Sequence, residues 1–169
     1  MTTIIHAGNG DSTMTYDGRV AWLAAPLRPV PVLALSGQDL EGAKLDAELA
    51  FPARIKQTLI RWRVGNAATI NDRDVQVVQG TTPGGALATL YFDDESGLLV
   101  RQMRYVDSPV GRIVTQVDYA DYREVAGIKI PYRRTLTWLD GRETIELTEV
   151  RVNVPIDAAK FAKPAAPPQ

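Results

Sequence analysis

The chain has 169 residues, the length of one ordinary domain, and its 45% hydrophobic and 23% charged residues are typical of a folded globular protein. Nineteen Lys and Arg residues nearly balance twenty Asp and Glu residues, so the composition predicts no basic surface for nucleic acid or anionic lipid. The absence of cysteine excludes disulfides and thiolate metal sites, and a single histidine, His6, leaves little for imidazole chemistry. The sequence also contains no apolar run long enough to cross a membrane, and its first five residues lack the basic-then-apolar pattern expected of a secretory signal.

Alternating apolar and polar residues, interrupted by turn dipeptides, predict a mainly β protein with about nine antiparallel strands. The first three strands are expected in the runs TTIIHA, STMTY and RVAWLA. Later turns are expected at Asn71-Asp72, Pro83-Gly84-Gly85, the loop 93–97, Ala126-Gly127 and Asp140-Gly141.

One stretch between these strands has helical periodicity. The preceding segment PLRPVPVLAL is predicted to be an extended edge or loop, because proline cannot pair in the middle of a sheet. A helix is expected to begin at Ser36, a good N-capping residue, and to end by Phe51, with a second short turn over 55–60. Leu40 and Ala47 lie on its apolar stripe, so we expect an amphipathic helix that packs on the face of the sheet, near Leu136 or Ile145.

The segment 128–154 is predicted to form a hairpin with a two-residue type I′ turn at Asp140-Gly141. This register places Leu136 opposite Ile145 and Arg134 opposite Leu147, with Glu149 on the diagonal as the acidic partner of Arg134. Arg134 is interpreted either as a rim arginine with a solvated head or as a group of the cavity. One face then carries Ile128, Ile130, Tyr132, Arg134, Leu136, Trp138, Ile145 and Leu147.

The apolar positions change parity along the last strand, because Ile145 and Leu147 are odd whereas Val150 and Val152 are even. A β-bulge near Thr148-Glu149 would return them to one face and bend the sheet. The sequence therefore predicts one strongly curved antiparallel sheet, an incomplete half-barrel, with one or two short helices covering its concave apolar face.

Three segments carry a family resemblance: YDGRVAW, LYFDDESGLLVRQ at 90–102, and VDYADYREVAGIKIPYR at 117–133. With the helix and the closing hairpin, they make the chain similar to the outer-membrane lipoprotein-sorting proteins of the lipoprotein carrier (LolA-like) superfamily. The resemblance implies an incomplete β-barrel, lidded by helices, that holds an acyl chain or another hydrophobic ligand in the periplasm. Family members open with a signal peptide, a helix and further strands, so the chain is expected to be truncated at its N-terminus or to be the C-terminal part of a longer exported protein.

Other chemically suggestive clusters are expected to be structural. Asp93 and its acidic neighbours could attract Ca²⁺, but we expect Asp93 to cap a turn in which Gly97 takes a positive φ. Asp118 and Asp121 have opposite strand parity, so they are expected to point to opposite faces rather than to act as paired acids. The four serines lie in or beside turns, with only His6 as a base. We therefore expect no catalytic residue, no metal site and no cofactor.

The sequence predicts a single LolA-like β-domain over residues 1–162, with a helical lid at about 36–60 and a Pro/Ala-rich tail or linker at 163–169. The expected function is non-enzymatic binding of a lipid or acyl-like ligand, in lipoprotein or lipid trafficking. The alternative is a structural or protein-interaction module, without a ligand, within a larger periplasmic protein. Expected partners are a hydrophobic small molecule or lipoprotein acyl chain and another protein or domain, but no nucleic acid. The candidate ligand-binding residues are Ile130, Tyr132, Arg134, Leu136, Trp138, Ile145 and Leu147, with Leu40 and Ala47 of the helix.

Overall fold

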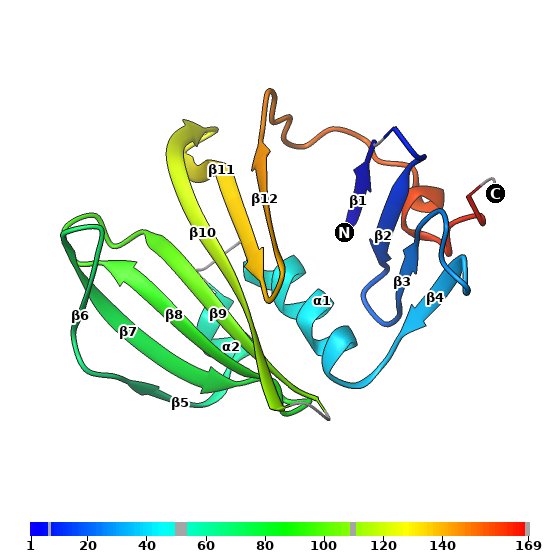
Figure 1. Cartoon of the computed structure of the whole chain (residues 1–169). Coiled ribbons are helices and arrows are strands. Elements are labelled where there is room, and N and C mark those ends of the chain that lie inside the picture. The colour runs from blue at the N-terminus through cyan, green and yellow to red at the C-terminus, as the bar shows by residue number, and fades with distance from the viewer. Residues whose placement is uncertain (7, 50–53, 109–110, 168–169) are drawn as a thin grey trace. The chain divides into compact units, whose positions relative to one another are not determined.

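The computed structural model describes residues 1–6, 8–49, 54–108 and 111–167, and the chain divides into two compact units (Figure 1). The first unit comprises Met1–Arg54 and Pro155–Gln169, and the second comprises Ile55–Val154. The predicted mainly β, antiparallel class is confirmed, because the described strands pair antiparallel in both units. The prediction of one sheet is wrong, since the first unit has a four-stranded sheet and the second an eight-stranded sheet. A single domain over residues 1–162 stays a prediction.

The four-stranded sheet of the first unit is a meander in which each strand pairs with the next. A tight turn between the second and third strands is fixed by Asp17, whose Oδ1 accepts hydrogen bonds from the amides of Arg19 and Val20, both at 2.7 Å. The proline-rich segment lies at the edge of this sheet, as predicted, because its strand comes last in the order. The strands are β1 (Thr2–Ile5), β2 (Ser12–Tyr16), β3 (Ala21–Ala24) and β4 (Val32–Leu35).

The predicted helix is present as α1 (Gly37–Leu49), but the expected amphipathic stripe is wrong. Glu41, Ala43 and Leu45 are buried, and positions 41 and 43 lie about 160° apart around a helix. The buried residues therefore do not form one stripe. Burial of Glu41 is tolerated because its carboxylate accepts a hydrogen bond from Lys44 Nζ at 2.7 Å.

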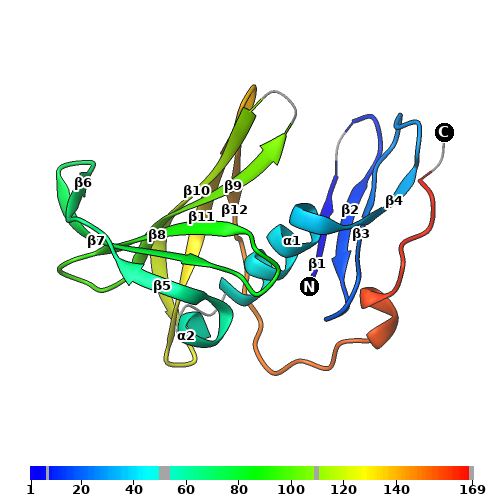
Figure 2. The ribbon, with the colours of Figure 1, turned by 90° about the horizontal axis from the view of Figure 1, so that it is seen from below.

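The eight-stranded sheet of the second unit is curved and open, as predicted for an incomplete barrel (Figure 2). Its strand order is β12-β11-β10-β9-β8-β7-β5, with β6 also paired to β7. The predicted second helical turn is present as α2, which precedes β5. The elements are α2 (Ile55–Thr58), β5 (Ile60–Val64), β6 (Ala68–Ile70), β7 (Arg73–Thr81), β8 (Leu87–Asp93), β9 (Leu99–Ser108), β10 (Gly111–Val125), β11 (Ile128–Trp138) and β12 (Gly141–Glu146).

One side of this sheet, which we call the α2 face, is identified by Gly80 of β7. A Cβ atom built on Gly80 would lie 3.0 Å from Leu59 Cβ, so Leu59, which directly follows α2, packs on this side of the strand. Directly paired residues share a face of a sheet. The register therefore extends the α2 face from Gly80 through Ala88, Leu90, Gln102, Val117 and Leu136.

The hairpin of β11 and β12 is present, but its predicted turn is wrong by one residue. Trp138 pairs with Gly141, so the connection is Leu139-Asp140, and neither Asp140 nor Gly141 has the positive φ of a type I′ turn. The reason is the Trp138 indole, whose Cζ2 would lie 2.5 Å from a Cβ atom at Gly141. Glycine is needed there for this close approach, and the pairing shifts by two residues while each side chain keeps its face.

The predicted bulge at Thr148-Glu149 is also wrong, because β12 ends at Glu146. One more backbone hydrogen bond joins Leu147 N to Tyr132 O at 2.8 Å, and the following segment leaves the sheet. The change of parity at Val150 therefore marks the end of strand pairing.

Candidate ligand-binding face

The structure brings four of the predicted site residues onto the α2 face of one hairpin. Arg134, Leu136 and Trp138 lie at alternate positions of β11, and Ile145 of β12 pairs directly with Arg134. Ile130 and Tyr132 have the same parity on β11, and Leu147 follows β12. Leu40 and Ala47 belong to α1 of the first unit, where both are half-buried rather than buried.

Exposure changes steadily across the α2 face. Ala88, Leu90 and Gln102, on the central strands β8 and β9, have no exposed surface (0%). Leu136 and Ile145 are half-buried, and Trp138 is 39% exposed. The centre of the face is therefore core, whereas its margin on β11 and β12 presents apolar surface that a ligand could cover.

Two buried hydrogen-bond donors interrupt this apolar face. The Tyr119 hydroxyl donates to Gln102 Oε1 at 2.8 Å, but Gln102 Nε2 is buried without a partner among the described residues. Tyr119 pairs directly with Arg134 across β10 and β11, and Arg134 Nε is likewise buried without a hydrogen-bond partner in the described part of the chain. An unsatisfied buried donor costs about 1–3 kcal/mol, so Arg134, which is only half-buried, would gain from a ligand group that accepts a hydrogen bond.

The predicted partner of Arg134 is wrong. The shifted register places Ile145 rather than Leu147 opposite Arg134, and Glu149 lies beyond the end of β12. Glu149 instead accepts two hydrogen bonds from Arg151, at 2.7 and 2.8 Å. The predicted placement of Arg134 on the apolar face is confirmed by the register, because a shift of two residues preserves parity.

The acidic loop after β8 forms the turn that the sequence predicts. Asp93 is buried, and its Oδ1 accepts hydrogen bonds from Ser96 N at 2.8 Å and Ser96 Oγ at 2.5 Å. Arg73 Nη1 donates to Asp93 Oδ2 at 3.3 Å. The hydrogen bonds from Ser96, followed by the charge and hydrogen bond of Arg73, lower the pKa of Asp93. Gly97 has φ +68°, as expected for the turn.

A hollow of about 390 Å³, which the sequence does not predict, lies in the second unit. Its lining residues Val75, Asp93 and Asp118 belong to the face of the sheet opposite the α2 face. Val75 and Asp93 line it together with Asp118 and Asp121 of β10. The register of β10 with β11 is the same on both sides of Asp121, since Ala120 pairs with Arg133 and Tyr122 with Pro131. Asp118 and Asp121 therefore keep opposite parity on the strand, as the sequence predicts, although Asp121 has φ +52°. Asp118 is occupied by Arg101 Nε at 2.6 Å and Gln116 Nε2 at 2.7 Å.

Tyr122 also lines this hollow. Its hydroxyl donates to Leu99 O at 2.6 Å, and burial raises the pKa of Tyr122 to about 12. The neutral phenol is therefore the form that the folded protein favours.

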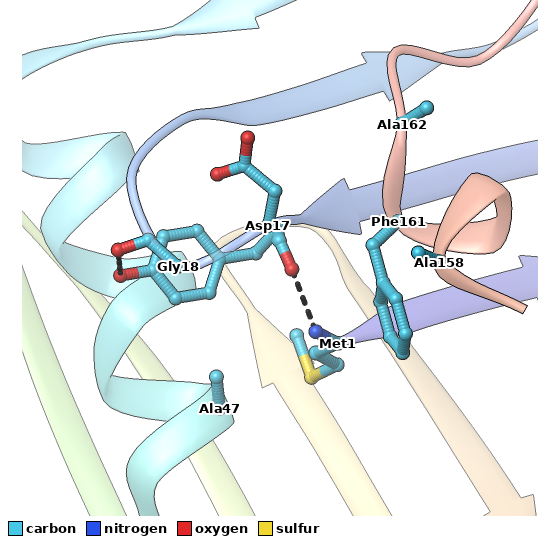
Figure 3. Close-up of a pocket in the computed structure, with 8 residues that line it drawn as sticks. Met1, Asp17, Gly18, Ala47, Ala158, Phe161 and Ala162 are labelled. Carbon is cyan, nitrogen blue, oxygen red and sulfur yellow. Dashed lines mark hydrogen bonds between the residues drawn. The ribbon is translucent and has the colours of Figure 1, made fainter. Parts of the chain in front are cut away.

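The first unit has a larger and more open pocket of about 620 Å³ (Figure 3). The Met1 amine donates to Tyr16 O at 2.7 Å, and burial lowers the pKa of this amine. Ala47, a predicted site residue, lines this pocket. The full lining is Met1, Tyr16, Asp17, Gly18, Ala47, Ala158, Phe161 and Ala162.

Among the described residues, no group of three or more His, Asp or Glu side chains is arranged to hold a metal ion. Neither α1 nor α2 offers the long apolar run that a membrane-crossing helix requires.

No protein-family model and no curated protein matches the sequence. Solved structures do match the fold. A domain assigned to outer membrane lipoprotein sorting from Vibrio parahaemolyticus has a TM-score of 0.55 and 15% identity, over 96% of this chain and 80% of that chain. A DUF1329 family protein from Desulfovibrio piger has a TM-score of 0.54 and 13% identity, over 93% and 70% of the two chains. The chain thus shares the fold of these two structures, and the resemblance read from the sequence is confirmed at the level of the fold.

Proposed function

We propose that the chain is a non-enzymatic, exported protein that binds a hydrophobic ligand with a polar head on the margin of the α2 face. The observation that carries this proposal is the neighbourhood of Leu136 and Ile145. These apolar side chains are half-buried, and Ile145 pairs directly with Arg134, whose Nε is buried without a hydrogen-bond partner in the described part of the chain. An acyl chain with a carboxyl, ester or phosphate head matches both features.

The energies favour such an amphiphile over a purely apolar ligand. Each methylene group buried against the β11 and β12 side chains contributes about 0.8 kcal/mol. A head that accepts a hydrogen bond from Arg134 also removes the cost of leaving this donor unsatisfied. The chain thus supplies binding energy along the apolar tail and selectivity at the head.

The proposed contact set keeps the residues expected from the sequence. In this proposal residues 1–162 act as one ligand-holding domain with a helical lid, and residues 163–169 are a tail. The fold shared with a domain assigned to lipoprotein sorting supports a role in lipoprotein or lipid trafficking and a periplasmic location. The contact residues are Ile130, Tyr132, Arg134, Leu136, Trp138, Ile145 and Leu147, with Leu40 and Ala47.

A second candidate function is a structural or protein-interaction module without a ligand. The observation in its favour is that Ala88, Leu90 and Gln102 are completely buried. The centre of the α2 face is therefore already filled by the protein itself, and the hollow of the second unit lies on the other side of the sheet.

Native mass spectrometry and uptake of a fluorescent fatty-acyl probe by delipidated protein separate the two functions. The ligand-binding proposal predicts saturable uptake that Leu136→Glu weakens about tenfold or more, because the new carboxylate must be buried against the chain. Thr137→Glu is the matched control, since Thr137 is the next residue of β11, faces the other side and pairs with Arg142. An empty protein that ignores the probe would favour the interaction module, and equal loss in both variants would contradict a site on the α2 face.

A further inference from the structure

Positive charge and exposed apolar surface coincide at one edge of the eight-stranded sheet. The sequence has no acidic residue between Glu48 and Asp72, whereas Lys56, Arg61 and Arg63 lie within this interval. All residues of β5 are exposed. Trp62 is 47% exposed and Val64 is 62% exposed. The overall charge of −1 conceals this local imbalance.

The backbone explains why both sides of this edge present apolar groups. β5 is the last strand of its sheet and pairs only with β7, with a register shift between Ile60 and Arg63. Trp62 lies on the α2 face, since its Cβ would be 3.2 Å from a Cβ atom at Gly80. Ile60 pairs with Thr81 across the sheet, on the opposite face. The irregular strand therefore exposes Trp62 on one face and Ile60 on the other.

The positive charges of Lys56, Arg61 and Arg63 are not neutralised by an acidic side chain among the described residues. Arg63 donates to Gln79 Oε1 at 2.8 and 3.2 Å, but this partner is neutral. No ion pair to a described residue involves Lys56, Arg61 or Arg63. The stretch of β7 that pairs with β5, residues 78–81, contains no carboxylate.

Edge protection explains only part of this pattern. Charged side chains and a bulge keep an exposed strand from pairing with another chain, which accounts for Arg61, Arg63 and the register shift. It does not account for a half-exposed tryptophan beside them. Tryptophan flanked by Arg and Lys, without acids, is typical of protein segments that lie at the headgroup level of an anionic bilayer.

We propose that the segment from Lys56 to Val64, which we call the β5 edge, docks on the surface of an anionic lipid bilayer. The three cations meet the lipid phosphates, and the Trp62 ring enters the headgroup layer with its apolar surface buried and its indole N–H solvated. This surface role goes beyond ligand binding, because it uses the opposite end of the sheet from β11 and β12.

Vesicle flotation with the full chain tests this proposal. We expect binding to vesicles of phosphatidylcholine with phosphatidylglycerol, weaker binding at high salt, and little binding to phosphatidylcholine alone. Each cation near an anionic surface contributes about a fivefold factor in affinity, so Lys56→Gln with Arg61→Gln should weaken binding roughly 25-fold. Trp62→Ser should also weaken it.

The control variant combines Lys129→Gln with Arg142→Gln, which removes the same charge from exposed positions on β11 and β12. It should bind anionic vesicles as the unmodified chain does. The proposal is overturned if the chain ignores anionic vesicles, binds neutral vesicles equally well, loses binding equally in the control, or binds soluble polyglutamate in preference to vesicles. Uptake of the acyl probe should be unchanged in the Lys56/Arg61 variant, which separates this proposal from ligand binding.

Discussion

The two halves of the α2 face differ in what surrounds them, although both arise from the same alternation of apolar and polar residues. Leu90 on β8 and Gln102 on β9 have no exposed surface, because these central strands have neighbours on both sides. Leu136 on β11 is half-buried and Trp138 is exposed, beside the edge strand β12. Hydrophobic patterning thus identifies the face, whereas the strand order decides which half is core and which half stays partly exposed.

The largest expected effect is a difference in the stability lost when a leucine is shortened in the central or in the marginal half of the α2 face. Leu90→Ala should lower the free energy of unfolding by about 2–5 kcal/mol, because it leaves a cavity in a fully packed site. Leu136→Ala should cost about 1 kcal/mol, since this side chain is already partly solvated. Urea denaturation of both variants measures the difference. Similar losses would show that β11 is as much a part of the core as β8.

The burial of Tyr122, which lines the hollow of the second unit, can be tested by the dependence of stability on pH. Burial raises the pKa of Tyr122 to about 12, above the value near 10 of an unfolded tyrosine. The stability that this shift contributes is complete below about pH 10 and is lost as the pH rises towards 12, by up to about 2 kcal/mol. Urea denaturation at several alkaline pH values measures this loss, which should be absent in Tyr122→Phe. The same alkaline loss in both proteins would contradict a buried Tyr122 phenol.

In the β11 and β12 margin of the α2 face, the position of the Trp138 ring should depend on Gly141. Gly141→Ala places a methyl group where the Trp138 indole lies, so the ring must move, at a cost of about 1–2 kcal/mol. Gly8→Ala is the control, because a Cβ atom there would meet nothing within 4 Å. Tryptophan fluorescence and thermal unfolding report the change. If both variants behave alike, the Trp138 ring does not rest on Gly141.

Gln102→Leu probes the buried donor in the packed half. The amide has one bonded end, to Tyr119, and one unpartnered end among the described residues. Replacing it with an apolar side chain of similar size should leave stability unchanged or raise it by about 1 kcal/mol. A loss of several kcal/mol in thermal unfolding would mean that Gln102 Nε2 has a partner in the folded protein.

The smallest expected stability change is at Arg134. Arg134→Leu should alter the free energy of unfolding by less than about 0.5 kcal/mol or raise it slightly, because the lost group includes a buried donor without a partner. Acyl-probe uptake by the same variant should weaken, since the polar head loses its donor. Unchanged uptake would remove Arg134 from the proposed site.

The sequence predicts the local chemistry of this fold better than its pairing. The helix at 37–49 and the Asp93 turn depend on neighbouring residues, so they follow from spacing alone. The hairpin register does not, because Gly141 serves the packing of Trp138 rather than the turn. The division into two sheets also depends on contacts between distant strands, which alternation does not specify.

The same limit applies to the site. Parity places Arg134, Leu136 and Trp138 on one face, and this part of the prediction is confirmed. Gln102 was not predicted to lie on this face. Its place there follows only from the pairing of β9 with its two neighbours, β8 and β10. The charge of the β5 edge is visible in the sequence between Glu48 and Asp72, but the whole-chain balance hides it.

Photolabelling with a diazirine fatty-acyl probe tests the ligand-binding account most directly. Peptide mapping of the labelled protein should place the probe on the segment 128–147, which carries the β11 and β12 margin of the α2 face. Labelling there should fall in Leu136→Glu and persist in Thr137→Glu. Label confined to the pocket of the first unit or to the hollow beside Asp118, or no specific label at all, would contradict a ligand site on the α2 face.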